Sequence, residues 1–211
     1  EEYWTIDAEF IPKGSRKQFK ASFYGDEKNK IDIKNESQAN EILLNLDGSV
    51  YEVYKLKKGK RRKSPAPPFI TSTLQQEASR KLNFTAKRTM RAAQELYEGI
   101  EIDGSGLTGL ITYMRTDSLR VSEDALKGSR DYISSRWGDK YLPESVRRFK
   151  TKAGAQDGHE AIRPTIPNLS PEEVKNNLSS DQYKIYKLVW ERFIASQMAN
   201  CIQNTTQVDI L

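Results

Sequence analysis

The sequence predicts an α+β protein in which a mainly helical domain is inserted into a small β domain. Alternating apolar and polar residues dominate the first sixty positions, which is typical of strands. From Ser72 the apolar residues recur at helical spacing instead, and an alternating segment returns at residues 207–211. We therefore expect the first part of a β domain over residues 1–66, a helical domain over residues 67–199, and a return strand of the β domain over residues 200–211.

Composition and charge describe a folded chain with a heavily charged surface. Of the 211 residues, 36% are hydrophobic and 30% are charged, and the formal net charge is +5. This basic excess suits a nucleic-acid partner, although many ordinary proteins share it. The single cysteine, Cys201, excludes a disulfide within the chain and favours a reducing, cytoplasmic setting. No apolar run approaches the roughly 20 residues that span a bilayer, so we expect no membrane partner.

In the first part we expect four strands and one short helix. The strands are expected over residues 3–11, 18–24, 30–33 and 49–56. Ser37 is expected to cap the helix, whose apolar residues are Ala39, Ile42, Leu43 and Leu46. Because strand-like segments reach both termini, we also expect the chain to be part of a longer protein.

A cationic run separates the two parts of the chain. Seven of the nine residues from Lys55 to Lys63 are Lys or Arg, and a Pro-rich stretch follows them. Because proline continues neither a helix nor a central strand, we predict a boundary or hinge here. The run itself has two interpretations that the sequence leaves open, a solvated charge run and a DNA contact.

The helical part begins with two helices joined by a short turn, an arrangement typical of helix-turn-helix modules. A capping box at Ser72 is expected to open the first helix, which ends near Leu82; Thr85 opens the second helix and Gly99 ends it. The apolar stripe expected on the second helix is Ala86, Met90, Ala93 and Tyr97. Its cations lie off this stripe, and we predict that they contact DNA phosphates: Lys87, Arg88 and Arg91.

Three further helices are predicted after a segment of unusual polarity. Ser122 is expected to cap the first of them, and Ser170, followed by Pro171, opens a short one. Ser180 opens the longest, and residues 138–157 are expected to be loop. The apolar face expected on the longest helix is Tyr183, Tyr186, Trp190, Phe193 and Gln197.

The polar segment that precedes these three helices, GLITYMRTDS at residues 109–118, is the strongest candidate for chemistry. A strand-like run ends here in a dense polar cluster, and on a strand Tyr113 and Arg115 would point to the same face. A guanidinium can hold phosphate oxygens while a phenol attacks phosphorus, which is the pattern of a tyrosine nucleophile. The ordinary alternative is a half-buried tyrosine beside a solvated arginine, with Asp117 and Ser118 as turn and capping residues.

A second polar segment holds the only histidine, His159, four residues before Arg163. On a helical turn the two side chains would share one side and could hold a second phosphate, although a single histidine is more often structural. No His, Cys, Asp and Glu cluster has metal-ligand spacing, and the Asp7 and Glu9 pair fits the polar face of a strand. We therefore predict that the chain itself holds no metal ion.

Together these segments resemble the type IA DNA topoisomerase family. GLITYMRTDS resembles the active-site tyrosine motif in the form of the bacterial enzymes. PAPPFITSTLQQEASRKL and QDGHEAIRPT resemble two further motifs of the family, in the same order and spacing. The resemblance covers most of residues 64–200, whereas residues 1–60 fit the family only in their strand-rich character.

The resemblance implies an ATP-independent isomerase that relaxes negative supercoils by breaking and rejoining one DNA strand. Tyr113 would be the nucleophile that holds the 5′ phosphate, and Arg115 would position the scissile phosphate. The remaining DNA contacts would come from the same two motifs: His159, Arg163, Asp117 and Ser118. The partner would be chiefly single-stranded DNA.

The same resemblance implies parts that residues 1–211 do not contain. The family's acidic domain, which binds Mg²⁺ and supplies a catalytic Glu and Lys, precedes this region, so Mg²⁺ would be bound outside this chain. We therefore expect the chain alone to be a monomer that cannot relax DNA.

Three other interpretations are compatible with part of the sequence. A non-catalytic DNA-binding module would use only the helix-turn-helix-like pair. A tyrosine recombinase would need His-x-x-Arg with the tyrosine downstream, whereas here His159 and Arg163 are four apart and Tyr113 is upstream. An interaction scaffold would leave unexplained the cations concentrated around a candidate nucleophile.

Overall fold

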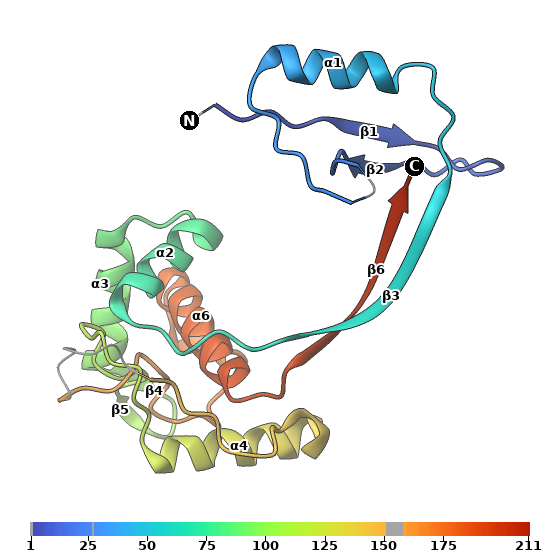
Figure 1. The fold of residues 1–211 in the computed structure, drawn as a ribbon. Coiled ribbons are helices and arrows are strands. Elements are labelled where there is room, and N and C mark those ends of the chain that lie inside the picture. Colours follow the sequence, from blue (N-terminus) through green and yellow to red (C-terminus); the bar gives the residue numbers. More distant parts are fainter. Residues whose placement is uncertain (1, 27, 151–157) are drawn as a thin grey trace. The chain divides into compact units, whose positions relative to one another are not determined.

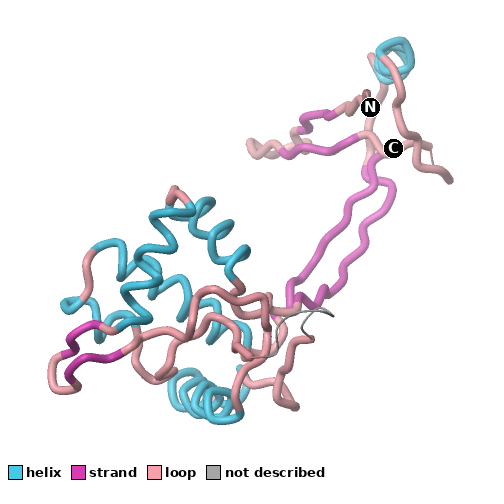
Figure 2. Tube along the Cα trace, turned by 90° about the vertical axis from the view of Figure 1, so that its left-hand side faces the viewer, coloured by secondary structure: helices cyan, strands magenta, loops and turns pink. Residues whose placement is uncertain are grey.

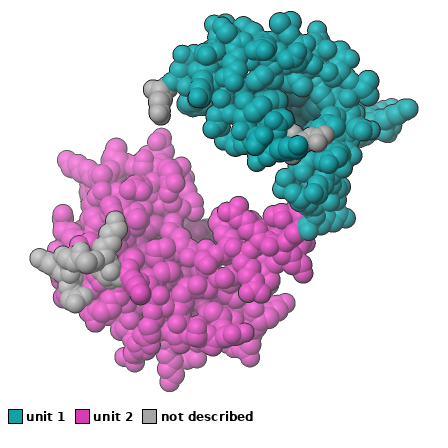
Figure 3. Space-filling model, in the orientation of Figure 1, with its two compact units in different colours: residues 1–58, 206–211 teal, residues 59–205 magenta. Residues whose placement is uncertain are grey.

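The computed structural model describes residues 2–26, 28–150 and 158–211, and it divides the chain into two compact units (Figures 1 and 3). Unit 1 comprises residues 1–58 and 206–211, and unit 2 comprises residues 59–205. The predicted α+β class is confirmed, because helices dominate unit 2 while small antiparallel sheets lie in both parts of the chain. The unit boundary runs through a pair of long strands, a few residues from the ends of the predicted domains.

Unit 1 is small and has little core. Strand β1 (Asp7–Phe10) pairs antiparallel with β2 (Phe19–Ser22), and helix α1 (Glu36–Leu46) follows. Among the described residues of this unit only Ile33 and Ala39 are buried hydrophobics.

Two expectations for unit 1 need correction. Asn35, not Ser37, caps α1, because its side-chain oxygen accepts a hydrogen bond from the Gln38 N–H at 2.9 Å. The strand expected at residues 30–33 is reduced to two isolated bridges, which join Trp4 to Ile33 and Gly25 to Lys30.

Two long strands form a ribbon that joins the units. Strand β3 (Val53–Lys63) pairs with β6 (Cys201–Ile210), and the ribbon and tube views both show them side by side (Figures 1 and 2). Next to the ribbon, Glu52 and Leu211 exchange two backbone hydrogen bonds of 2.9 and 3.0 Å. The Lys55–Lys63 segment, predicted to be a boundary or hinge, is part of this strand pair, and the boundary between the two units falls within it, after Lys58. Every β3 residue is exposed, so the strand has no apolar alternation by which the sequence could reveal it.

Unit 2 holds the helices and two very short strands. Its elements are α2 (Thr71–Leu82), α3 (Ala86–Glu98), β4 (Ile100–Ile102), β5 (Gly106–Thr108), α4 (Glu123–Trp137), η1 (Asp139–Tyr141), α5 (Pro171–Val174), η2 (Lys175–Asn177) and α6 (Ser180–Ser196). The predicted caps Thr85 and Ser122 and the predicted C-terminal Gly99 are confirmed. Strands β4 and β5 pair antiparallel across a tight turn, and they are too short for the sequence pattern to reveal them.

The core of unit 2 lies where α2 and α3 pack against α6. Helix α6 carries most of the expected face, because Tyr186, Trp190, Phe193 and Gln197 are all buried. The stripe expected on α3 is shifted. The buried residues of that helix are Thr89, Ala92, Ala93 and Leu96. None of the helices within the described ranges is long and apolar enough to cross a bilayer.

A buried carboxylate fastens α2 to α6. The side chain of Glu77 on α2 is only 9% exposed and lies 2.7 Å from Arg80, 2.8 Å from Lys81 and 3.3 Å from Arg192 of α6. The Arg192 guanidinium also lies 4.4 Å from the centre of the Phe69 ring. These cations, with the Lys81 hydrogen bond first among them, lower the pKa of Glu77.

We expect Glu77→Gln to lower the free energy of unfolding by about 1–3 kcal/mol at neutral pH, because three cations lose their carboxylate. The folded-state pKa lies below the unfolded value, so this stabilisation is present above the unfolded pKa and disappears as pH falls through the folded pKa. Urea unfolding of both proteins in neutral and in acidic buffer measures this difference in the free energy of unfolding. The exposed Glu144→Gln is the control, and a difference that persisted in acid would contradict the assignment.

Candidate active site

The segment that carries Tyr113 is held by backbone contacts on both sides. Leu110 donates its N–H to Leu96 O at the end of α3 over 2.7 Å, and Thr112 donates to Arg163 O over 2.9 Å. A side chain at Gly109 would lie 2.8 Å from Tyr97 O, so only glycine permits this approach. The regular strand predicted for LITYM is absent, and only an isolated bridge between Ile111 and Pro164 remains of it.

Tyr113 lies half-buried between two other rings. The Tyr97 ring, from the last turn of α3, meets it edge-on with centroids 5.4 Å apart, and the His159 imidazole lies tilted against it at 5.0 Å. The side chain thus packs on the core of unit 2 without being sealed inside it. This arrangement fixes the ring plane of Tyr113 and brings the second polar segment next to the first.

An open pocket of about 520 Å³ adjoins this stack. It is lined by the start of α2, by the residues after Tyr113 and by the histidine: Ile70, Thr71, Ser72, Arg115, Thr116, Asp117 and His159. The Thr71 hydroxyl holds the first two parts together. It donates to Met114 O at 2.8 Å and accepts from the Thr116 N–H at 2.9 Å.

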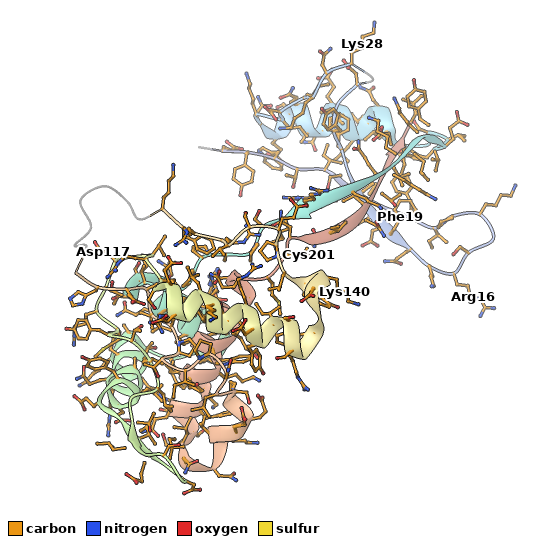
Figure 4. All side chains as sticks on the ribbon, turned by 90° about the horizontal axis from the view of Figure 1, so that it is seen from below. Arg16, Phe19, Lys28, Asp117, Lys140 and Cys201 are labelled. Atoms are coloured by element: carbon orange, nitrogen blue, oxygen red, sulfur yellow. The ribbon has the colours of Figure 1, made fainter. Side chains whose placement is uncertain are left out.

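The pocket suits an anion. Arg115 and His159 are exposed on its walls, and the first turn of the twelve-residue helix α2 borders it. A helix N-terminus carries partial positive charge and favours phosphate groups. Asp117, which is labelled in Figure 4, is exposed and also lines the pocket. An ionised carboxylate only accepts hydrogen bonds, so Asp117 is suited to a base amino group and unsuited to phosphate.

Arg163 does not share a face with His159, as a helical turn would require. The segment is not helical, and the Arg163 guanidinium is buried. It donates to Glu160 at 2.7 Å, to Pro164 O at 2.9 Å and to the Ser122 hydroxyl at 3.2 Å. Since Ser122 caps α4, Arg163 ties the histidine segment to that helix, and it is not among the residues that line the pocket.

Ser118 also differs from the expectation of a DNA contact. It is fully buried, its N–H donates to the Thr116 hydroxyl at 3.0 Å, and its own hydroxyl accepts from the Arg120 N–H at 3.2 Å. Its contribution is therefore to shape the turn after the tyrosine.

We expect Arg163→Met to lower the free energy of unfolding by about 2–4 kcal/mol, because Glu160 would keep a charge without its partner. Thermal unfolding measures this loss, and the exposed Arg120→Met is the matched control. The slope of DNA affinity against salt should not change. A variant of normal stability whose salt slope fell by about one would show instead that Arg163 contacts a phosphate.

The cations predicted on α3 have different surroundings. Arg88 forms a two-pronged pair with Asp181 of α6, at 2.7 Å for both hydrogen bonds, and covers the Phe84 ring. Arg91 pairs with Glu95 one turn along, at 3.1 Å. Lys87 is exposed. The Arg88 charge is thus occupied in joining two helices, whereas Lys87 and Arg91 remain exposed.

Sequence reasoning missed five residues of the site: Ile70, Thr71, Ser72, Tyr97 and Thr116. Tyr97 was expected on the buried stripe of α3, but it is 42% exposed and contacts Tyr113. Ser72 was expected only to open a capping box, and Thr71 was given no individual role. The N-cap is Ile70, whose N–H donates to the Thr73 hydroxyl at 3.0 Å. The available signals were the three hydroxyl residues at 71–73 and the resemblance of PAPPFITSTLQQEASRKL to a motif of the family.

The described residues include no group of three or more His, Cys, Asp or Glu side chains placed to hold a metal ion. Asp117 is the only carboxylate in the pocket lining. The donor set of this part of the chain is therefore poor for Mg²⁺, which prefers several oxygen ligands in octahedral geometry.

Comparisons with known proteins agree on one family. A family model described as DNA topoisomerase matches residues 1–211. Among solved structures, full-length topoisomerase I from Thermotoga maritima matches with a TM-score of 0.69 and 38% sequence identity. The match covers 90% of this chain and 29% of that protein, so this chain corresponds to less than a third of that relative's length.

Proposed function

The chain belongs to the bacterial DNA topoisomerase family, and from this premise we propose that Tyr113 is the nucleophile of a type IA enzyme. In that enzyme it would cleave and rejoin one strand of DNA. The observation that supports this most directly is the position of Tyr113. It is half-buried against His159 and next to an anion-suited pocket that Arg115 and the start of α2 line.

The proposed reaction exchanges one phosphoester for another. The Tyr113 hydroxyl oxygen bonds to phosphorus, the bond from phosphorus to the 3′ oxygen of the preceding nucleotide breaks, and that oxygen receives a proton. Because the number of phosphoester bonds is unchanged, the broken strand can be rejoined by the reverse step without ATP. Between the two steps the 5′ phosphate stays on Tyr113 as a phosphotyrosine.

Three groups of the pocket have complementary roles in this proposal. Arg115 would donate parallel hydrogen bonds to the non-bridging phosphate oxygens, where negative charge builds up during transfer. The first turn of α2 would face the same oxygens with its N–H groups. His159, whose ring packs on Tyr113, would hold a phosphate oxygen close to the hydroxyl that forms the new bond.

The whole enzyme would require parts outside residues 1–211. We propose that Mg²⁺ is bound there and neutralises phosphate charge when present. A phenol becomes an effective nucleophile when its proton is removed, so Tyr113 also needs a proton acceptor in the whole enzyme. Single-stranded DNA is the proposed substrate because the pocket is open and must admit an unpaired backbone. The isolated chain is expected to be monomeric and inactive. The parent enzyme that contains it is expected to act in the cytoplasm.

Trapping the covalent intermediate tests the proposal. The full-length parent enzyme is mixed with a labelled single strand, denatured and digested, and the nucleotide-bearing peptide is sequenced by mass spectrometry. We expect the adduct on Tyr113 through a 5′ phosphate. An adduct on another residue, or active relaxation with no adduct, would refute it and favour a DNA-binding role without a nucleophile for this chain.

A further inference from the structure

Tyr97 is an exposed aromatic side chain for which the proposed cleavage step has no role. It lies in the last turn of α3 and is 42% exposed. Tyr113 packs against the hydrophobic core of unit 2, whereas Tyr97 belongs neither to that core nor to the residues packed on it. Its one ring contact within the described ranges is the edge-on contact with Tyr113. Packing of the core therefore does not account for an aromatic residue at this position.

The backbone that carries Tyr97 is fixed beside the tyrosine segment. The N–H of Leu110 donates to the carbonyl oxygen of Leu96 over 2.7 Å, which joins the end of α3 to that segment. Gly109 lies so close that a Cβ atom there would be only 2.8 Å from the carbonyl oxygen of Tyr97. The fold therefore places Tyr97 next to Tyr113 through contacts that do not involve either side chain.

Tyr113 lies between two rings that have different surroundings. The His159 ring, at 5.0 Å, lines the pocket together with Arg115. The Tyr97 ring, at 5.4 Å and inclined by 65°, is not among the residues that line the pocket. An edge-on pair of rings covers at most one face of each ring, and Tyr97 is 42% exposed. A flat face of Tyr97 is consequently open to a ligand, next to the nucleophile and outside the phosphate pocket.

A nucleobase is the flat group that the proposed reaction brings to this position. Bases of single-stranded DNA stack on exposed aromatic side chains, and they do so with little regard to sequence because every base has a π face. In the proposed intermediate the 5′ phosphate of one nucleotide is bonded to the Tyr113 oxygen. Only a sugar separates the base of that nucleotide from its phosphate. The covalent bond therefore holds this base close to Tyr97.

We propose that Tyr97 is the stacking platform for the first base downstream of the break, the base of the nucleotide whose 5′ phosphate Tyr113 carries. The inference rests on the proposed function, because it takes Tyr113 as the nucleophile. Stacking binds this nucleotide before cleavage. While the strand is open, stacking keeps the attached end in place, so that phosphorus stays within reach of the free 3′ oxygen. All four bases are accepted, since a stack does not read base edges.

A strand that lacks this one base tests the proposal in the full-length parent enzyme. The cleavage site on a labelled single strand is mapped first, and a second strand then carries an abasic site directly 3′ of the scissile phosphate. The strand concentration that gives half-maximal single-turnover cleavage is measured for both. For the unmodified enzyme we expect this concentration to be about tenfold higher with the abasic strand, as for the loss of one stacked base. A strand with its abasic site far downstream is the substrate control.

Tyr97→Leu removes the π face while it keeps apolar bulk and helix propensity. With the complete strand we expect the same rise of about tenfold in the half-maximal concentration, and a maximal rate within about threefold of the unmodified enzyme. With the abasic strand Tyr97→Leu should lose nothing further, because the stack is already absent. Tyr97→Phe retains the ring and should recover the preference for the complete strand. Tyr141→Leu is the matched control, since Tyr141 is also 42% exposed and lies outside the ring stack.

Equal melting temperatures establish that the variants are folded. The proposal fails if the unmodified enzyme cleaves both strands at equal concentrations. It also fails if Tyr97→Leu impairs cleavage of both strands equally, because Tyr97 would then only position the Tyr113 ring. Mapping the adduct separates this inference from the proposed function. An adduct on a residue other than Tyr113 overturns both, whereas an adduct on Tyr113 without an effect of the missing base overturns only the stacking role.

Discussion

Tyr113→Phe in the full-length enzyme should abolish the covalent DNA adduct and lower DNA relaxation by a factor on the order of 10⁴ or more. The substitution removes one hydroxyl and retains the ring, so the contacts with Tyr97 and His159 are preserved. Affinity for single-stranded DNA should consequently stay within about threefold of the unmodified enzyme, because the ring and its packing contacts are retained. Gel assays of relaxation and denaturing gels of the labelled adduct measure the two losses.

Tyr97→Phe is the matched control for that experiment. Tyr97 belongs to the same ring stack and is 42% exposed, yet the proposal gives its hydroxyl no bond to make. It should therefore leave adduct formation intact. If Tyr113→Phe kept its activity, or if Tyr97→Phe lost as much as Tyr113→Phe, the assignment of the nucleophile would be wrong. Retained activity in Tyr113→Phe is also the result expected if the chain is a DNA-binding module without a nucleophile.

Arg115→Gln should slow strand cleavage by about 10²–10³-fold, the usual cost of removing one preorganised charge donor from a developing anion. Arg115 is exposed in the pocket, so the loss should come without a change in melting temperature. Because a lysine restores the charge without the two-pronged geometry, Arg115→Lys should recover only part of the rate. Single-turnover cleavage of a labelled strand measures the rate directly.

Arg120→Gln is the comparison for Arg115→Gln, since Arg120 is exposed in the same segment and does not line the pocket. Its cleavage rate should match that of the unmodified enzyme. Equal losses in both variants would mean that the charge of the whole segment matters, and that Arg115 has no particular position at the phosphate.

The helices were predicted well because their signals are local. The side chains of Thr85 and Ser122 accept hydrogen bonds from backbone N–H groups in the first turns of α3 and α4. The start of each helix can therefore be predicted from only four residues. The apolar face of α6 repeats over almost five turns, and its burial follows directly from that repetition.

Other parts depend on contacts that a single sequence does not reveal. Strand β3 is fully exposed, and only its pairing with β6, more than a hundred residues later, makes it a strand. Arg163 is in the predicted motif, but its burial depends on Glu160 and on the start of α4. The Thr71 contact with the tyrosine segment spans more than forty residues, and nothing in the local pattern at Thr71 indicates it.

The burial of Phe69 affects how force on β3 is transmitted along this chain. β3 ends at Lys63, and the chain runs from there through Phe69 to Thr71 at the pocket wall. Phe69 is fully buried, it pairs with Ile162 through its backbone, and Arg192 covers its ring. A pull on the ribbon is therefore borne by this anchor before it can reach Thr71. The pocket beside Tyr113 can therefore keep its dimensions when the chain that leads to it moves.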